Sequence, residues 1–333
     1  MRIVVTGASG NLGTACLREL AAGGDHEVVG VARRRPPGPV ADGRSSVTWR
    51  ALDVGYDDLD SVLSGADAVV HLSWMFQPTH RPAETWQTNV IGTRRLLDAV
   101  RRRGVPVVVC ASSVAAYSPV DHDRPIDEGW HTDGASTAAY CREKAYNERV
   151  LDAFEQSSPG TRVVRLRPSF VFQRSAASEQ RRIFGGPLLR PAMLDRRFVP
   201  VLPVPRGLRM QAVHAGDVAR AVAAAVERPV SGAFNLAADG VLGAEDLGAL
   251  LDARPVRLPP GLMRAGLDAA WHARMAPVPG SLLSAVMSLP LLATERARAE
   301  LDWTPRHTAE QAVGDMLEGA AMSAGSQMPP LHP

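Results

Sequence analysis

Short apolar runs recur along the first half of the chain, with amphipathic stretches between them. The runs cover residues 3–5, 27–32, 47–52, 67–72 and 105–111. The first run shows no alternation of apolar and polar positions, which is typical of a strand covered on both faces. Residues 12–20, 57–63 and 81–103 have the composition or helical spacing of helices. The alternation of strands and helices predicts an α/β fold with a parallel sheet.

Three glycines follow the first apolar run at intervals of three residues. Gly7 lets the chain turn, Gly10 lets the backbone approach a pyrophosphate, and Gly13 lets the following helix pack closely on the strand. A helix that begins there directs free N–H groups at the phosphates. A glycine-rich turn can also serve only to reverse the chain, but the position between a strand and an amphipathic stretch favours a dinucleotide site.

The second run ends at Ala32 and is followed by three arginines. In a dinucleotide fold this strand end faces the adenosine ribose, where a carboxylate accepts from a 2′-hydroxyl and an arginine accommodates a 2′-phosphate. Arg33 and Arg34 therefore favour NADP over NAD, although NAD stays possible. The alternative interpretation is a solvated basic loop, which extends to about residue 46.

Polar side chains follow the next strands at the edge where ligands of parallel sheets bind. Asp53 ends the third strand, and its side chain could accept from the adenine amino group. The fourth strand continues into Ser73 and Trp74. Asn89 lies inside the predicted helix 81–103, where it either points to water or has a specific buried partner.

The fifth strand and the helix after it carry the candidate catalytic groups. The strand delivers Ser112 and Ser113, and Tyr140 and Lys144 lie four residues apart on one helix face. A nearby lysine and the positive nicotinamide ring would lower the pKa of the phenol, which is ordinarily near ~10. A serine hydroxyl and a phenol around one substrate oxygen suit alcohol–ketone interconversion. Each motif also occurs by chance, so their combination carries the interpretation.

Composition narrows the class of protein. The 333 residues are 45% hydrophobic and 22% charged with a net charge of +2, so the chain has no general nucleic-acid or membrane footprint. Its three cysteines, at 16, 110 and 141, form no disulfide framework or metal-ligand spacing. We find neither a signal-peptide layout nor an apolar run of the ~18–20 residues a membrane span needs, and we expect a soluble cytoplasmic protein.

These motifs together resemble the extended short-chain dehydrogenases/reductases of the NAD(P)-dependent epimerase/dehydratase family. Later segments that match are Leu166-Arg167-Pro168, Val213-His214-Ala215-Gly216-Asp217 and Leu301-Asp302-Trp303. The resemblance implies that Ser113 positions the substrate oxygen, Tyr140 is the acid/base, and Lys144 holds the ribose and tunes Tyr140. It implies cofactor contacts from Gly7, Ser9, Gly10, Asn11, Leu12, Gly13, Arg33, Arg34, Asp53, Val54, Leu72, Ser73, Trp74, Asn89, Ala111, Tyr140, Lys144, Pro168 and Ser169.

The resemblance also implies a division of the chain. Residues 1–170 would form a Rossmann-type cofactor domain with a doubly wound parallel sheet, to which about 208–240 return. Residues 171–207 with 241–320 would form a smaller substrate lobe. Members of the family commonly dimerise through the helix near Arg81 and the helix that carries Tyr140. His214 and Asp217 are expected to hold a strand–helix junction. After Met322 the chain is small, polar and proline-rich, and we expect 323–333 to be disordered.

Three departures from the family pattern concern the substrate. Phe170 stands where sugar-nucleotide enzymes place an asparagine near the phosphates, and Met210 stands where they carry an arginine, with Arg209 shifted by one position. Val114-Ala115 replaces the Asp-Glu pair of the dehydratases, so elimination of water is not expected. The Met- and Leu-rich stretch 258–292 either packs in the hydrophobic core or lines an apolar substrate cleft.

The sequence thus favours an NADP(H)-dependent oxidoreductase that acts on a ketone or secondary alcohol. The alternative is a sugar-nucleotide epimerase that uses the same side chains without net redox. A catalytically silent cofactor-binding protein is a third possibility, against which the intact Ser113, Tyr140 and Lys144 argue.

Overall fold

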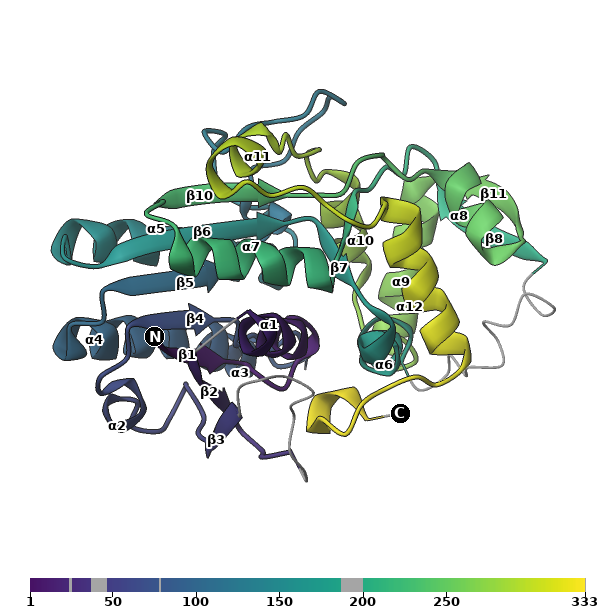
Figure 1. Ribbon diagram of the computed structural model, residues 1–333. Helices are drawn as coiled ribbons and strands as arrows, with labels where there is room; N and C mark the ends of the chain where they lie inside the picture. Colours follow the sequence, from purple (N-terminus) through teal and green to yellow (C-terminus); the bar gives the residue numbers. More distant parts are fainter. Residues whose placement is uncertain (24–25, 37–46, 78, 187–199, 333) are drawn as a thin grey trace.

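A seven-stranded parallel sheet forms the centre of the computed structural model, which describes residues 1–23, 26–36, 47–77, 79–186 and 200–332 (Figure 1). The strand order is β10-β6-β5-β4-β1-β2-β3, and every neighbouring pair is parallel. The strands are β1 (Arg2–Thr6), β2 (Glu27–Ala32), β3 (Val47–Ala51), β4 (Ala68–His71), β5 (Val107–Ala111), β6 (Arg162–Pro168) and β10 (Gly232–Leu236). Strand order reverses between β1 and β4, as in a doubly wound fold, which confirms the predicted fold class.

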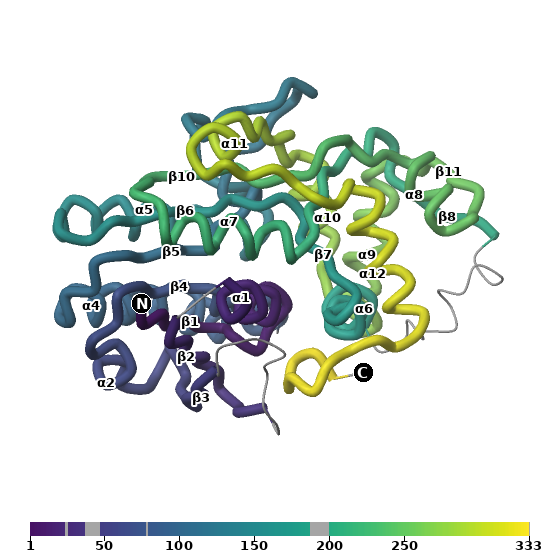
Figure 2. Tube along the Cα trace, viewed as in Figure 1, coloured from purple at the N-terminus to yellow at the C-terminus, as the bar shows by residue number. Residues whose placement is uncertain are grey.

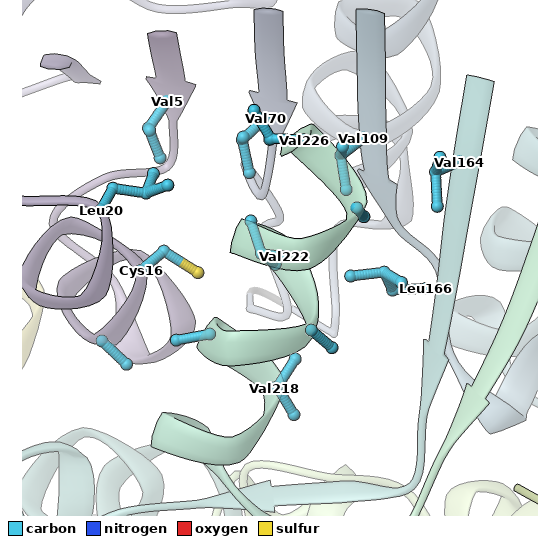
Figure 3. Close-up of a cluster of buried hydrophobic side chains, with 14 of the residues drawn as sticks. Val5, Cys16, Leu20, Val70, Val109, Val164, Leu166, Val218, Val222 and Val226 are labelled. Carbon is cyan, nitrogen blue, oxygen red and sulfur yellow. The ribbon is translucent and has the colours of Figure 1, made fainter. Parts of the chain in front are cut away.

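Helices cover both faces of this sheet because its strands are apolar on both sides. One face packs against α1 (Asn11–Ala22), α7 (Ala215–Glu227) and α11 (Glu295–Leu301). Figure 3 shows Cys16 and Leu20 of α1 and Val218, Val222 and Val226 of α7 directed at the strands. The other face packs against α2 (Asp60–Leu63), α4 (Gly92–Arg103) and α5 (Ala139–Ser157).

The helix predicted over 81–103 is divided into three parts. An α-helical turn, α3 (Pro82–Trp86), is followed by a π-helical turn over Gln87–Ile91 and then by α4. Such turns insert an extra residue into the helix and often occur at functional sites. Here the π-helical turn contains Asn89, whose side chain is fully buried.

Segments from the second half of the chain pack at the carboxyl edge of the sheet, on the right in Figures 1 and 2. They include the parallel pairs β7 (Phe170–Phe172) with β9 (Ala212–His214) and β8 (Val201–Pro205) with β11 (Arg254–Leu258). The helices are α6 (Ala177–Gly185), α8 (Ala244–Leu251), α9 (Pro260–His272), α10 (Gly280–Met287) and α12 (Ala309–Ala321). The arginine-containing residues 187–199 and the loop 37–46 lie outside the described residues.

The prediction that the end of the chain is disordered is wrong for residues 323–332. A 3-10 turn over Pro329–Leu331 packs against the molecule, with Leu331 0% and Met328 5% exposed. Both contact Ala176, and Trp49 of β3 packs against this cluster. Arg182 of α6 donates to the carbonyls of Pro330 and His332. Two apolar anchors and these hydrogen bonds order a segment whose composition suggested disorder.

Within the described ranges, every helix is too short or too polar to cross a lipid bilayer. The three cysteines are buried and unpaired.

Candidate active site

A cavity of about 410 Å³ runs along the carboxyl edge of the sheet and continues between α6 and α10. Its wall brings together most of the predicted site residues: Gly7, Ser9, Gly10, Asn11, Leu12, Gly13, Arg33, Asp53, Val54, Leu72, Ser73, Trp74, Ala111, Ser113, Tyr140, Lys144, Pro168 and Ser169. Two predicted residues, Arg34 and Asn89, are not on this wall. Ligands of open parallel sheets bind at this edge, beside the point where strand order reverses.

The three glycines of the first turn have different surroundings. Gly7 has a φ of +69°, and a side chain there would collide with the backbone of Leu72 and Ser73. A side chain at Gly13 would collide with the backbone of Gly7 and Ala8, so the helix packs closely on the turn. At Gly10 the nearest atom to an added Cβ would be the Gly7 oxygen at 3.4 Å. Gly10 therefore leaves open space on the cavity side, where a ligand can approach the backbone.

Helix α1 begins at Asn11 beside this open space. Its N-cap is Gly10, and no side chain caps its first turn. The free N–H groups of this turn and the positive end of the helix dipole suit an anionic ligand. Gly10 and α1 together can hold a pyrophosphate.

The ends of β2 and β3 form one end of the cavity. Arg33 is exposed and lies on its wall, whereas Arg34 is exposed outside it. Asp53 also lines this end, and its Oδ1 accepts from the Gly55 amide at 2.8 Å. A guanidinium and a carboxylate are thus available where the predicted adenosine would lie.

Tyr140 and Ser113 both line the cavity. Ser113 follows β5 and accepts from the Ala115 amide at 3.1 Å, which fixes its side chain. Burial raises the pKa of Tyr140 to about 12, and the nearby Ser113 hydroxyl, which favours the phenolate, offsets only part of that effect. The phenol is therefore protonated at neutral pH and can donate a proton to an oxygen held beside it.

Lys144 lies one helical turn from Tyr140 and is only 4% exposed. Its Nζ donates to the Ala111 carbonyl at 2.9 Å and lies 3.5 Å from the centre of the Trp74 ring. Burial lowers the pKa of Lys144 to about 7, while Glu148 and Glu143 act in the opposite direction. The cation–π contact and the carbonyl bond fix the Lys144 side chain, whose Nζ lies 5.9 Å from the centre of the Tyr140 ring.

Asn89 has specific buried hydrogen-bond partners, which was one of the two alternatives that the sequence allowed. Its Nδ2 donates to the Met75 carbonyl at 2.8 Å and to Glu143 Oε2 at 2.6 Å, and its Oδ1 accepts from the Met75 amide. Thr85 donates to the other oxygen of Glu143 at 2.6 Å. Asn89 therefore fixes the segment after β4, which carries Trp74 and Phe76, against the helix that carries Tyr140.

A buried ionic network holds α5, the helix that carries Tyr140, against the sheet. Glu148, which is 0% exposed, accepts from Arg167 Nη2 at 2.8 Å, from Arg165 Nη1 at 3.0 Å and from the Ser112 hydroxyl at 2.6 Å. The two arginines hold the pKa of Glu148 at about 2 despite its burial. The network ties α5 to the ends of β5 and β6, beside the candidate catalytic residues.

Several residues of the wall were missed by the sequence reasoning. Phe76 contacts Tyr140 with ring centres 5.4 Å apart, and Phe184 of α6 contacts Phe76 at 5.2 Å. Glu179 and Gln180 of the same helix also line the cavity, as does Pro330. No spacing rule identifies them, because α6 and the last turn reach the cavity only through tertiary packing.

The departures from the family pattern have clear positions. Phe170 lies on the cavity wall, whereas Arg209 is engaged elsewhere, since it donates to the His122 carbonyl and pairs with Asp123.

His214 caps α7 through the Gly216 amide, and buried Asp217 accepts from the His307 amide at 3.0 Å. In stretch 258–292, Leu282 and Leu289 line the cavity, and α9 has no buried residue.

The residues present fit a nicotinamide dinucleotide. Gly10 leaves space at an uncapped helix start, and Arg33 and Asp53 lie at one end of the same cavity. At the other side of the sheet edge, Ser169 is 6% exposed on the cavity wall, and no hydrogen-bond partner for its hydroxyl lies among the described residues. A buried hydroxyl without a partner is costly, so Ser169 suits a polar group of a ligand.

Comparisons with known proteins agree with this geometry. A family model described as "NAD dependent epimerase/dehydratase family" matches residues 3–237. An uncharacterized protein of Mycobacterium tuberculosis is 29% identical over 245 residues, which are 73% of this chain. The chain spans only 22% of the length of that relative. A UDP-glucose 4-epimerase of Erwinia amylovora is 28% identical over 179 residues, which are 50% of this chain and 52% of the epimerase.

Solved structures share the fold over nearly the whole chain. The UDP-glucose 4-epimerase of Thermotoga maritima, solved with UDP-glucose, has a TM-score of 0.71 at 19% identity and covers 97% of this chain and 99% of its own. MoeE5, solved with UDP-glucuronic acid and NAD, has a TM-score of 0.70 at 20% identity, with 97% and 100% covered. Since the family match extends over more than half of the residues, the chain belongs to the NAD dependent epimerase/dehydratase family, a family of enzymes within the short-chain dehydrogenases/reductases.

Proposed function

We propose that the protein is an NADP(H)-dependent oxidoreductase that interconverts a ketone and a secondary alcohol. The observation that carries this proposal is that Ser113, Tyr140 and Lys144 line the same cavity as the glycine turn. We assign cofactor binding to residues 1–170 with about 208–240, and substrate binding to 171–207 with 241–320. The three buried free cysteines suit a reducing cytoplasm.

Ser113 and Tyr140 hold the substrate oxygen and move its proton. When bound, the cofactor supplies a hydride to the carbonyl carbon, or accepts one from the alcohol carbon. In reduction, the Ser113 hydroxyl donates a hydrogen bond to the carbonyl oxygen, and Tyr140 transfers its phenolic proton to that oxygen. The raised pKa of Tyr140 suits this direction, because the phenol is fully protonated before the reaction.

Lys144 stabilises the phenolate that remains after proton transfer. Its Nζ is held one helical turn from Tyr140, and its charge favours the ionised phenol. Solvent protons then restore the phenol. Val114-Ala115 follows Ser113 and provides no acid–base pair for removal of water, so the proposal does not include dehydration.

Arg33 supports NADP as the preferred cofactor. Its guanidinium lies on the cavity wall directly after β2, where a 2′-phosphate is recognised in dinucleotide folds. Solved relatives of the same fold contain NAD, among them MoeE5 and an epimerase of Thermus thermophilus, so NAD is the competing cofactor.

A sugar-nucleotide epimerase is the second candidate function, because UDP-glucose 4-epimerases are among the sequence relatives and structural neighbours. The two functions differ in net redox change. An epimerase returns the hydride to its product, whereas a reductase consumes NADPH stoichiometrically.

The test is turnover by the purified, cofactor-stripped protein with NADPH or NADH. We expect loss of NADPH absorbance with ketones and no interconversion of UDP-glucose and UDP-galactose. Conversion of the nucleotide sugar without net absorbance change would establish the epimerase instead.

We also propose a homodimer that forms through α3 and α5. Trp86 of α3 and Tyr146 of α5 are 37% and 41% exposed, and their rings lie 4.9 Å apart on the surface. An aromatic pair in tilted contact that remains exposed is typical of the centre of an interface.

A further inference from the structure

The cavity continues beyond the catalytic phenol into a chamber between α6 and α10. One side of this chamber is an aromatic wall of Trp74, Tyr140, Phe76 and Phe184, in which each ring contacts the next at 5.2–5.5 Å between centres. Leu282 and Leu289 also line the chamber. Phe184 is 47% exposed although it lines the cavity, so a ligand would bury apolar area there.

Among the described residues, none that lines this chamber beyond the phenol carries a positive charge. The cavity has two cationic side chains in the described part of the chain: Arg33 lies at the end of β2, and Lys144 is engaged by Ala111 and Trp74. Phe170 and the displaced Arg209 remove two further groups that could bind phosphate. A diphosphate placed here would lose its hydration without gaining compensating charges from the described residues that line the chamber.

The polar groups of the chamber are acceptors. Glu179 lines it from the first turn of α6, and burial raises the pKa of its carboxyl to about 7. Gln180 is 8% exposed, and its Nε2 donates to the Val171 carbonyl at 2.8 Å. Its Oε1 finds no hydrogen-bond partner among the described residues. A buried amide oxygen without a partner and a carboxylate beside it are suited to a donor group of a ligand.

We propose that the substrate is an apolar carbonyl compound, or the matching secondary alcohol, that carries no phosphate or carboxylate, and that Glu179 is the residue that excludes anions. The ring or chain of this compound packs against Phe76 and Phe184, which places its carbonyl at Tyr140. A hydroxyl or ammonium group of the substrate donates to Glu179 or Gln180. This inference rests on the proposed hydride-transfer function and adds the substrate class.

Three aryl ketones of the same shape test the proposal: acetophenone, 4-acetylbenzoate and 4-(aminomethyl)acetophenone. With NADPH at pH 8, where Glu179 is mostly ionised, we expect kcat/KM for the anionic ketone to be about tenfold or more below that of acetophenone. The cationic ketone should be at least as good as acetophenone.

Glu179→Gln should bring the anionic and neutral ketones to within about threefold of each other, because it removes the charge and keeps the shape. The matched control is Glu310→Gln, which removes an exposed carboxylate from α12 and should leave the ratio unchanged. An unchanged ratio in Glu179→Gln, or equal kcat/KM for the three ketones in the wild type, would remove Glu179 from this role.

Binding measurements test the proposed substrate class independently of the proposed hydride transfer. Saturation-transfer NMR of the wild-type protein with NADP should detect acetophenone at about 10 mM and should detect no UDP-glucose. Binding of UDP-glucose without any aryl ketone would overturn the substrate class and leave hydride transfer standing. Binding of acetophenone without its reduction would support the class and contradict the proposed function.

Discussion

At the scale of single residues, burial dominates the pKa of the Tyr140 phenol. In the protein without cofactor, burial raises that pKa to about 12, so the lowering expected from Lys144 together with the nicotinamide ring stays a prediction for the complex with cofactor. Lys144 is buried as well, and its own pKa falls to about 7, so it carries only part of a charge at neutral pH. Desolvation depends on the packed environment, which four-residue spacing does not reveal.

Tyr140→Phe should reduce turnover by about 10²-fold or more, because the variant lacks the hydroxyl that transfers the proton. Binding of NADP should change little, since the aromatic ring and its contacts with Trp74 and Phe76 remain. Steady-state kinetics and calorimetric titration with NADP measure the two effects separately. Undiminished turnover would exclude Tyr140 as the acid/base.

Lys144→Met should flatten the pH dependence of stability in the cofactor-free protein. Burial lowers the pKa of Lys144 from 10.5 to about 7, so between these values the unfolded chain binds a proton that the folded protein has lost. The free energy of unfolding contributed by this lysine therefore rises with pH through the window, by about 1.4 kcal/mol per pH unit. Below pH 7 the folded protein must bury the charged Lys144 ammonium, so the contribution of this lysine to the free energy of unfolding is at its lowest.

Urea unfolding of wild type and Lys144→Met between pH 7 and pH 9 measures this contribution as a difference. Other titrating groups, including the buried thiols, are common to both proteins and cancel. Parallel stability curves for the two proteins would mean that Lys144 keeps an ordinary pKa in the fold.

Replacement of both Arg33 and Arg34 by alanine should weaken NADP binding about tenfold or more and affect NAD much less, because a guanidinium–phosphate hydrogen bond is lost. Arg33 carries most of this expectation, since it lies on the cavity wall and Arg34 does not. Arg124→Ala is a control for the loss of an exposed positive charge. Equal losses for both cofactors would identify these arginines as a solvated loop.

At the scale of elements, α5 is held to the sheet by a charge that has no access to water. Glu148→Gln should cost about 3–5 kcal/mol of unfolding free energy, because Arg165 and Arg167 would remain buried with less compensation. Asp152→Asn is the matched control: Asp152 also pairs with Arg165 but is 43% exposed, so we expect a much smaller cost. Urea titration measures both, and equal costs would contradict the network's role.

The strands of the cofactor half could be predicted because buried parallel strands are continuous apolar runs. Residues 27–32 match β2, and the other four runs differ from their strands by one or two residues at one or both ends. The division of 81–103 was not predictable from periodicity, since the π-helical turn depends on Asn89 finding Met75 and Glu143. The ordered end of the chain depends in the same way on contacts with Ala176 and Trp49.

At the scale of the whole molecule, the cavity is assembled from distant parts of the chain. Motifs near strand ends predicted the side that carries Gly7, Ser113 and Tyr140, because these positions have local signatures. Glu179 and Leu282 come from helices that have no motif, so only the packed fold brings them to the cavity. This difference explains why chemistry could be inferred from sequence more readily than the substrate.

The exposed Trp86–Tyr146 pair makes the proposed dimer testable. These rings lie on α3 and α5, which also carry the Thr85–Glu143 bond and Tyr140, so association would cover the outer side of the active-site supports. Substitution of both rings by aspartate should convert dimers to monomers, because two charges would be buried at the interface. Sedimentation velocity measures the change, and Tyr56→Asp, at a tyrosine that is 66% exposed, is the control. A wild-type protein that sediments as a monomer at about 10 μM, where a stable homodimer is formed, would refute the dimer.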